Sequence, residues 1–249
     1  MRDAREAEGP ASAQILVVEH EAAADAALIG DRVAAQGFRS VVVGPDRGAS
    51  VPERAAGYAG VVVLGGSMGP TDDDVAPWLP ATRELIRDCV ATATPLLAVC
   101  LGAQLTAVAL GGRVAALPAP EVGLLPVDVD AGPDLLLGGL PARAPTLQWH
   151  WLHVTDPPPG AVVLASSPAC LVQAFRVGER AWATQFHLEA VASTARTWAR
   201  DEAEAVAALG LDPDQVVAEW ENAAGEVEQV WATVIDRWLA VARDAWPVD

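Results

Sequence analysis

Residues 95–104 read Pro95-Leu96-Leu97-Ala98-Val99-Cys100-Leu101-Gly102-Ala103-Gln104. A short apolar run that turns at a glycine into a helical stretch is typical of a buried strand followed by a helix. A cysteine on such a strand–turn–helix elbow is pushed out at the end of the sheet. It also lies at a helix N-terminus, where free N–H groups favour the thiolate. The elbow makes Cys100 a candidate nucleophile, and a buried structural cysteine is the alternative.

The rest of the chain supports an α/β fold with this elbow inside its sheet. Before the elbow, apolar runs of strand length alternate with helical stretches, and the region beyond it contains shorter strands with Pro and Gly between them. We predict a flavodoxin-like three-layer sandwich with a mostly parallel central sheet and an antiparallel or mixed extension. Strands are expected at 15–18, 41–43, 61–64, 95–99, 122–129, 145–149, 161–166, 171–177 and 181–186, and helices at 22–36, 78–92 and 102–110.

Three regions are expected along the chain: a flexible N-terminal arm (1–13), the α/β domain (14–190) and a helical C-terminal extension (191–249). In the extension, Asp212-Pro213 is typical of an N-cap with proline at the first helical position. The last segment carries an apolar stripe at helical spacing, which we expect to pack on the domain, on a second copy in a homodimer or on a partner. The stripe consists of Trp231, Val234, Ile235, Trp238, Leu239 and Ala242.

Composition excludes several classes of function. The chain has 249 residues, 52% of them apolar, and a formal net charge of −17, which disfavours nucleic acid as a partner. No apolar stretch approaches the roughly 20 residues of a membrane span, and residues 1–6 carry mixed charge with no secretion signal. Three scattered cysteines form neither a disulfide framework nor a zinc site. We therefore expect a cytoplasmic protein without a membrane partner.

The basic residues are all arginine: the sequence has sixteen of them and no lysine. A P-loop needs a lysine that reaches the phosphates, and a pyridoxal enzyme needs one for its Schiff base. Both classes are excluded, and we expect neither a cofactor nor a metal.

Two further segments are candidates for the same site. A strand runs through Trp182-Ala183-Thr184-Gln185-Phe186 and ends in His187-Leu188-Glu189. Beyond the strand end His187 can act as base, and Glu189 can hold its imidazole in one tautomer, although a lone His-x-Glu is more often a surface pair. At Leu64-Gly65-Gly66-Ser67-Met68-Gly69 a strand ends in two glycines, whose backbone can approach a ligand closely. Taken alone, this glycine pair has an ordinary turn as its alternative.

Together the three motifs resemble class I glutamine amidotransferases, and most of all stand-alone proteins similar to the glutaminase domain of GMP synthase. The resemblance rests on their order and separation and covers residues 14–190. It is strengthened by Leu147-Gln148-Trp149-His150 and by the segment from Ala165 to Phe175.

The resemblance implies a role for each site residue. Cys100 attacks the side-chain amide of glutamine, His187 carries the proton to departing ammonia, and Glu189 orients His187. The N–H groups of Gly66 and Leu101 form the oxyanion hole. Gly65, Gln104 and Trp151 contact the substrate.

Two positions depart from the family pattern. Leu188 replaces the usual proline between histidine and glutamate, which loosens that turn slightly. Trp151 follows Trp149-His150 where the family continues with glycine, so we expect a bulky loop residue near the site that reshapes the pocket. For His150 and His153 we prefer the interpretation of a capped strand end.

Three functions remain open. The chain is a glutaminase whose ammonia feeds a separate synthetase, since residues 191–249 are too short for a synthetase domain and no ATP-binding motif is visible. Alternatively, it is an independent hydrolase of γ-glutamyl amides or peptides that uses the same triad. The third alternative is a non-catalytic binding protein with this fold, which the intact triad disfavours.

Overall fold

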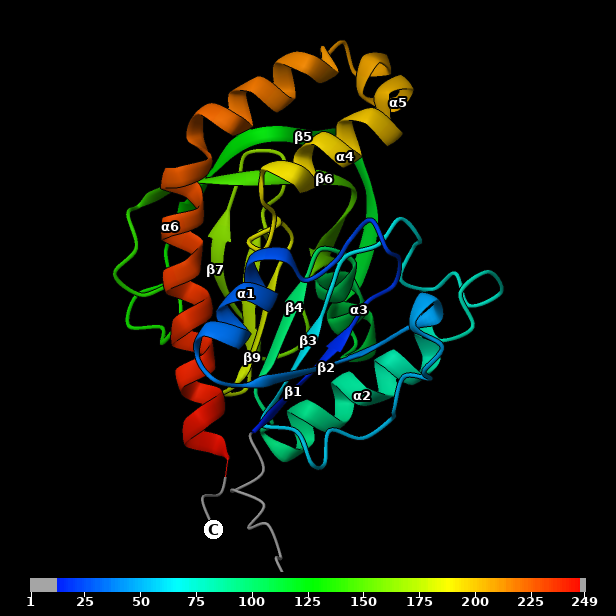
Figure 1. Ribbon diagram of the computed structural model, residues 1–249, viewed down its shortest axis with the longest axis vertical. Coiled ribbons are helices and arrows are strands. Elements are labelled where there is room, and N and C mark those ends of the chain that lie inside the picture. The colour runs from blue at the N-terminus through cyan, green and yellow to red at the C-terminus, as the bar shows by residue number, and fades with distance from the viewer. Residues whose placement is uncertain (1–12, 247–249) are drawn as a thin grey trace, which may run out of the picture.

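A computed structural model describes residues 13–246, and within them one sheet of nine strands forms the middle layer (Figure 1). The strands are β1 (Gln14–Val18), β2 (Arg39–Val43), β3 (Gly60–Val63), β4 (Leu96–Val99), β5 (Arg113–Val129), β6 (Arg143–Asp156), β7 (Val162–Ser166), β8 (Ala174–Val177) and β9 (Ala181–Thr184). The helices are α1 (Ala27–Ala35), α2 (Leu79–Thr92), α3 (Leu101–Ala109), α4 (Ala192–Asp201), α5 (Ala203–Ala208) and α6 (Pro213–Ala245), with a 3₁₀ turn η1 (Pro45–Arg47). Of the predicted N-terminal arm, only Ala13 lies inside the described residues.

The sheet has a parallel half and an antiparallel half. Its order is β2-β1-β3-β4-β9-β8-β7-β5-β6, and the first five of these strands run parallel. From β9 onward, each neighbouring pair is antiparallel. The predicted α/β fold with its mixed extension is confirmed.

Side chains of β1 alternate between the two outer layers. Ile15 and Val17 join the apolar cluster that includes α1 and α6, whereas Leu16 and Val18 join the cluster that includes α2 and α3. Strands buried on both faces need apolar residues at consecutive positions, which explains the short valine and leucine runs. The result is a three-layer sandwich.

The first helix starts later than the sequence predicts. Instead of beginning at residue 22, α1 begins at Ala27, and residues 20–24 form turns. The Ala22 N–H donates to Asp46 Oδ2 at 3.2 Å, and the Ala23 carbonyl accepts from Trp198 Nε1 at 2.7 Å. These distant partners satisfy backbone groups that a helix would have paired internally. The β1–α1 loop therefore stays open, at the carboxyl end of β1.

The antiparallel half contains a long hairpin that the sequence did not reveal. We predicted short strands at 122–129 and 145–149, but β5 and β6 extend over 17 and 14 residues. A bulge separates the pairs Ala116–Leu152 and Glu121–His150. It contains Pro118 and Pro120, which lack the N–H of a regular ladder and hide the continuity of β5.

The C-terminal helices pack on the chain's own sheet. The six residues of the predicted stripe on α6 are all buried within the cluster that includes Ile15 and Val17. Trp231 Nε1 donates to the Pro145 carbonyl at 2.9 Å. The predicted start of α6 is confirmed, because the Asp212 carboxylate accepts from the Asp214 N–H at 3.0 Å, with Pro213 next to the cap. In Figure 1, α6 runs along the sheet while α4 and α5 cross its upper end.

None of the helices in the described part of the chain is both long enough and apolar enough to cross a membrane.

Candidate active site

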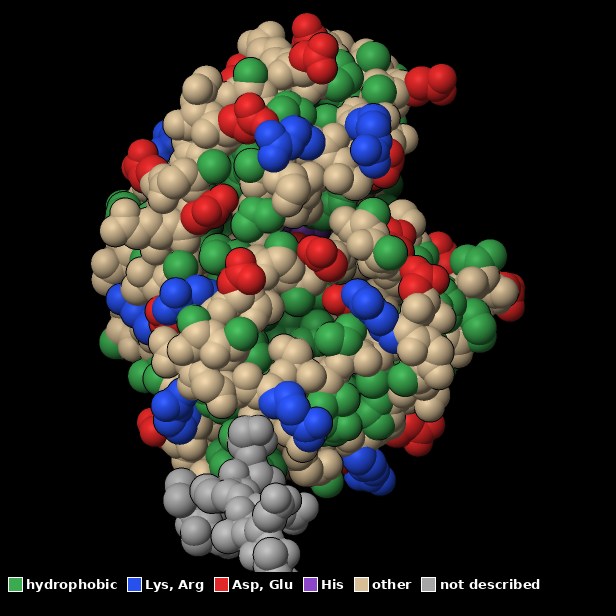
Figure 2. Space-filling model, in the orientation of Figure 1, with side chains coloured by type: hydrophobic (Ala, Val, Ile, Leu, Met, Phe, Trp, Pro, Cys, Tyr) green, Lys and Arg blue, Asp and Glu red, His purple; other side chains and the backbone are tan. Residues whose placement is uncertain are grey.

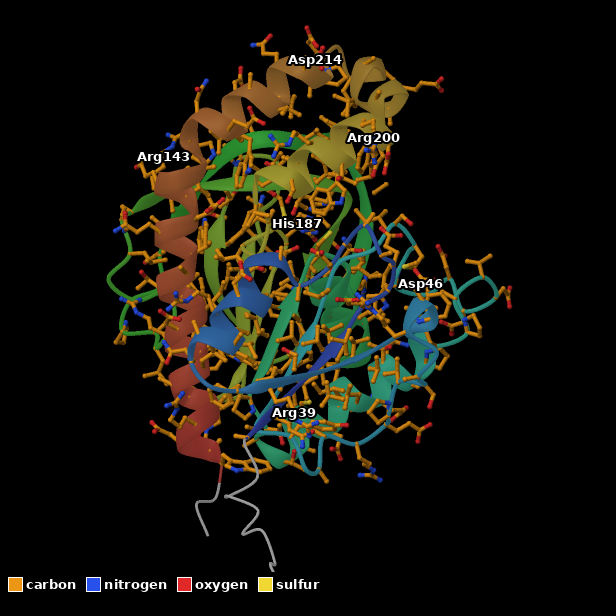
Figure 3. The ribbon with its side chains drawn as sticks, in the orientation of Figure 1. Arg39, Asp46, Arg143, His187, Arg200 and Asp214 are labelled. Carbon is orange, nitrogen blue, oxygen red and sulfur yellow. The ribbon has the colours of Figure 1, made fainter. Side chains whose placement is uncertain are left out.

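The site lies where four neighbouring parallel strands end. The loops after β1, β3, β4 and β9 begin with Glu19, Leu64, Cys100 and Gln185, and parallel strands in register bring their carboxyl ends to one edge. Figure 3 labels His187 in the interior, below α4. In Figure 2 a histidine is visible at the bottom of a narrow recess at the same place.

Cys100 has the backbone of a nucleophile elbow. Its φ is +51° and its ψ is −105°, an unfavourable region for a residue with a Cβ. The strand continues up to this point, since the Cys100 N–H donates to the Thr184 carbonyl at 2.8 Å. Gly102 permits the turn, because a Cβ there would lie 2.2 Å from the Val63 carbonyl oxygen. The side chain of Cys100 reaches the cavity described below.

His187 and Glu189 form a buried pair next to this cysteine. His187 Nδ1 donates to Glu189 Oε1 at 2.7 Å, and both side chains are almost fully buried. With Nδ1 engaged, the Nε2 edge of the ring is left for the nucleophile. Burial alone would lower the pKa of His187, but Glu189 and Cys100 together raise it to about 10. This favours a thiolate–imidazolium pair between Cys100 and His187.

Leu188, which replaces the family's proline, is buried in the apolar core. The 2.7 Å bond between His187 and Glu189 is therefore formed with leucine between them.

Trp198 of α4 holds the other side of the imidazole. Its ring meets His187 edge-on with 4.5 Å between centroids, and its Nε1 donates to the Ala23 carbonyl at 2.7 Å. The ring of Trp149 lies 5.8 Å from Trp198 on the same side. The sequence analysis missed Trp198, because only the fold brings α4 beside β9.

The glycine pair after β3 faces the nucleophile. A Cβ on Gly65 would lie 3.1 Å from His187 Cε1 and 3.5 Å from Cys100 Cβ, so no side chain fits there without displacing the imidazole. Gly66 lines the cavity, and a Cβ on it would come within 3.0 Å of Leu101 Cδ2. Leu101 opens α3, where a helix leaves its first N–H groups unpaired. Gly66 and Leu101 thus stand on either side of the Cys100 elbow.

Two glutamines connect the nucleophile to β6. Gln104 Nε2 donates to the Leu152 carbonyl at 3.1 Å and to Gln185 Oε1 at 3.3 Å. Gln185 Nε2 in turn donates to Cys100 Sγ at 3.7 Å. The amide hydrogens of Gln104 are therefore engaged, and its Oε1 is the atom left for a ligand. Contact between Cys100 and Gln185 was not predicted, although Gln185 belongs to the quoted motif.

Strand β6 contributes residues that the sequence analysis placed wrongly. We predicted Trp151 in a loop and His150 and His153 at a capped strand end, but all three lie inside β6. The strand continues past Trp149 because it pairs with the far end of β5 across the bulge. Trp151 and His150 both line the cavity.

His150 is also the end of a buried polar network. Its Nε2 lies 3.2 Å from Glu121 Oε2, and the same carboxylate accepts from Ser167 at 2.8 Å and from Gln173 at 2.8 Å. Burial would raise the pKa of Glu121, but its bonds to His150 and Ser167 lower it. The network keeps a charged carboxylate behind the cavity wall, and the sequence offers no local signal for it.

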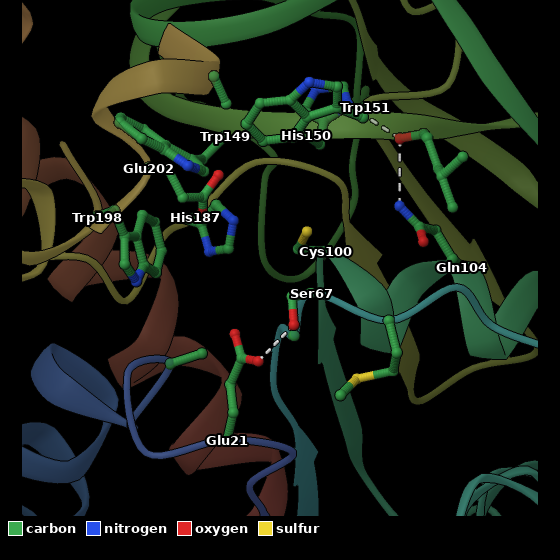
Figure 4. Close-up of a pocket in the computed structure, with 15 residues that line it drawn as sticks. Glu21, Ser67, Cys100, Gln104, Trp149, His150, Trp151, His187, Trp198 and Glu202 are labelled. Atoms are coloured by element: carbon green, nitrogen blue, oxygen red, sulfur yellow. Dashed lines mark hydrogen bonds between the residues drawn. The ribbon is translucent and has the colours of Figure 1, made fainter. Parts of the chain in front are cut away.

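A cavity of about 300 Å³ joins these groups, which is the size of a small-molecule site (Figure 4). It is lined by Glu21, Ala24, Gly66, Ser67, Met68, Cys100, Gln104, Trp149, His150, Trp151, Leu152, His187, Trp198, Glu202 and Ala205. Glu21 and Glu202 were not predicted. Between residues 13 and 246, no cluster of His, Cys, Asp and Glu has the arrangement of a metal site.

The fold and the elbow define an α/β protein with a cysteine at the carboxyl edge of a parallel sheet, beside a buried His–Glu pair. The family model of glutamine amidotransferase class I matches residues 23–204. The chain belongs to this family, as its motifs indicated.

Among curated proteins, the chain is similar to the glutaminase part of GMP synthases. It is 34% identical over 166 residues to the glutamine-hydrolyzing GMP synthase of Aeropyrum pernix, which covers 65% of this chain and 30% of that protein. The corresponding protein of Nocardia farcinica is 34% identical over 181 residues, covering 72% and 32%. One separately encoded component of the glutamine-hydrolyzing GMP synthase of Sulfurisphaera tokodaii is 37% identical over 99 residues, covering 39% and 52%. The chain spans about a third of the length of the first two.

Solved structures match nearly the whole chain. A glutamine amidotransferase from Thermotoga maritima superposes with a TM-score of 0.83 at 24% identity, covering 91% of this chain and 98% of that one. A glutamine amidotransferase from Methylobacillus flagellatus gives 0.84 at 25% identity, covering 92% and 95%. The likeness extends beyond the α/β domain into the C-terminal helices, because the covered share leaves few residues out.

Proposed function

We propose that the chain hydrolyses the side-chain amide of glutamine through a thioester on Cys100, with His187 as proton carrier and Glu189 as its orienting partner. One observation carries the proposal: a strained elbow cysteine shares a small cavity with a histidine whose Nδ1 is held by a buried glutamate at 2.7 Å. This is the arrangement that nucleophilic amide hydrolysis requires.

The reaction follows from these positions. The Cys100 thiolate attacks the amide carbon, and the charge that develops on the carbonyl oxygen meets the N–H groups of Gly66 and Leu101. His187 gives its proton to the amide nitrogen, the C–N bond breaks and ammonia leaves. Water then attacks the thioester while His187 accepts a proton, which releases glutamate and restores the thiolate.

The cavity walls have separate tasks in this proposal. Gly65 keeps the space between His187 and Cys100 free of side-chain atoms. Gln104 presents its Oε1 to the substrate, since its amide hydrogens bond Leu152 and Gln185. Trp151 covers the cavity from β6.

The ammonia is passed to a separate acceptor or synthetase. Support comes from the relatives, which are named as glutamine-hydrolyzing GMP synthases and, in Sulfurisphaera tokodaii, as one distinct component of such an enzyme. A second candidate is an independent hydrolase of γ-glutamyl amides with the same triad, which the acidic side of the cavity favours. A homodimer remains compatible with either role.

The test is steady-state release of ammonia from glutamine by the purified chain, alone and with fractions of cell extract. We expect a slow basal rate that a synthetase-containing fraction raises, together with mass-detected labelling of Cys100 by a glutamine-like electrophile. A high rate that no fraction changes would favour the independent hydrolase. If no condition gives turnover and Cys100 stays unlabelled, a binding protein with this fold is the remaining function.

A further inference from the structure

Two carboxylates line the cavity on the side of His187, from parts of the chain far apart in sequence (Figure 4). Glu21 lies in the β1–α1 loop, and Glu202 lies at the junction of α4 and α5. Glu21 Oε2 accepts from Ser67 Oγ at 2.7 Å. Neither carboxylate has an ion-pair partner within residues 13–246.

Nothing in the cavity wall neutralises this acidic pair. No arginine lines the cavity, and its two histidines already face carboxylates of their own, Glu189 for His187 and Glu121 for His150. The pKa of Glu202 is raised, first by burial and then by the charges of Glu21 and Asp201, which together outweigh the opposing effect of the Trp149 indole. Mutual repulsion of this kind is relieved by a bound cation.

Aromatic rings complete the acidic side of the cavity. Trp149 and Trp198 stand beside Glu202 with ring centroids 5.8 Å apart (Figure 4). Trp149 is buried, and its Nε1 lies close enough to lower the pKa of Glu202 without forming a hydrogen bond of regular geometry. Carboxylates next to indole faces are the surroundings that bind alkylammonium groups.

We propose that the site also hydrolyses γ-glutamyl amides whose amine portion carries a positive charge, with Glu21 and Glu202 binding the ammonium group. This inference rests on the Cys100 chemistry proposed above. The thiolate attacks the γ-carbonyl carbon, the C–N bond breaks, and His187 protonates the nitrogen that leaves as the free diamine. Water then hydrolyses the thioester, giving glutamate.

The amine portion fits the acidic pair better than the glutamyl end does. The glutamyl end carries an α-carboxylate beside its α-ammonium, so two glutamates would repel one group while attracting the other. A γ-glutamyl diamine has an additional ammonium with no carboxylate near it. Its alkyl chain also suits the indole rings of Trp149 and Trp198.

The test compares γ-glutamyl-(4-aminobutyl)amide with γ-glutamyl-pentylamide, which replaces the ammonium by a methyl group of similar size. We expect kcat/KM to be about tenfold higher for the charged amide, and Glu21→Gln and Glu202→Gln each to reduce that ratio several-fold. Glu204→Gln is the matched control, because Glu204 is an exposed glutamate of α5 outside the cavity. It should leave the ratio unchanged.

Equal kcat/KM for the two amides in a chain that hydrolyses glutamine would overturn the inference and leave the proposed function standing. The α-ammonium is tested separately by comparing glutamine with glutaramate, which lacks the α-amino group. If the Glu→Gln variants change only that comparison, the acidic pair binds the glutamyl end and the inference is wrong. Absence of any turnover, with Cys100 unlabelled, would overturn both proposals together.

Discussion

The three cysteines of the chain differ in what surrounds their sulfur atoms. Burial raises the pKa of the Cys89 thiol and of the Cys170 thiol to about 12 in each case. Cys100 instead lies at a helix N-terminus, beside a histidine whose raised pKa keeps it cationic. Reactivity is therefore a property of position rather than of residue type.

We expect Cys100→Ala to abolish ammonia release and labelling by a glutamine-like electrophile. Cys89→Ser and Cys170→Ser should keep kcat within about twofold, because neither thiol reaches the cavity. The measurements are steady-state ammonia release and intact-protein mass after labelling. Labelling at Cys89, with activity lost on its replacement, would show that the nucleophile is misassigned.

His187 and Glu189 should differ in weight. Replacing the proton carrier removes the chemistry, whereas replacing its orienting partner only disturbs it, so we expect His187→Ala to lower kcat about 100-fold more than Glu189→Gln. The opposite order in steady-state rates would reverse the two roles.

The pH dependence follows from the same pair. Glu189 helps to raise the pKa of His187 to about 10, so the imidazolium that protonates the leaving nitrogen is lost only as pH rises through that value. Glu189→Gln removes this support, and the alkaline fall of kcat/KM should move to lower pH. A profile with an unchanged alkaline limb would mean that another group titrates there.

At the scale of elements, much of the parallel half could be predicted, because its strands are short apolar runs with glycine stops. The elbow and the ends of β3 and β9 follow from that topology, which places their motifs at one edge. The β5–β6 hairpin could not be predicted, since Pro118 and Pro120 interrupt its pattern. Glu21, Trp198 and Glu202 were also missed, because tertiary packing alone brings the β1–α1 loop, α4 and α5 to the cavity.

Helix α4 should act as a support for the base. Trp198→Phe keeps an aromatic edge against His187 but loses the 2.7 Å bond to Ala23, so we expect kcat to fall several-fold. Trp220→Phe is the matched control, since Trp220 is a fully buried tryptophan of α6 outside the cavity, with Nε1 unpaired in the described structure. It should affect the melting temperature alone. Equal losses of kcat in both variants would reduce Trp198 to a packing residue.

At the scale of the molecule, the acidic cavity lies in a chain with a formal net charge of −17. Long-range attraction of a cationic substrate adds to the local contact with Glu21 and Glu202. Glutamine, with no net charge, receives neither benefit. Salt separates the two kinds of substrate, because it screens long-range attraction between exposed charges.

We expect kcat/KM for γ-glutamyl-(4-aminobutyl)amide to fall about tenfold between roughly 0.01 M and 1 M salt, while glutamine changes less than about twofold. Over that range the screening length shrinks from about 30 Å to about 3 Å, so the attraction of distant carboxylates disappears. A double variant, Glu21→Gln with Glu202→Gln, separates local from global charge: it removes two carboxylates and leaves the rest of the surface unchanged. This variant should lose its preference for the charged amide at every salt concentration and yet keep part of the salt dependence. If glutamine responds to salt as strongly as the charged amide, screening acts on the stability of the fold rather than on substrate attraction, and the acidic surface has no part in selecting the substrate.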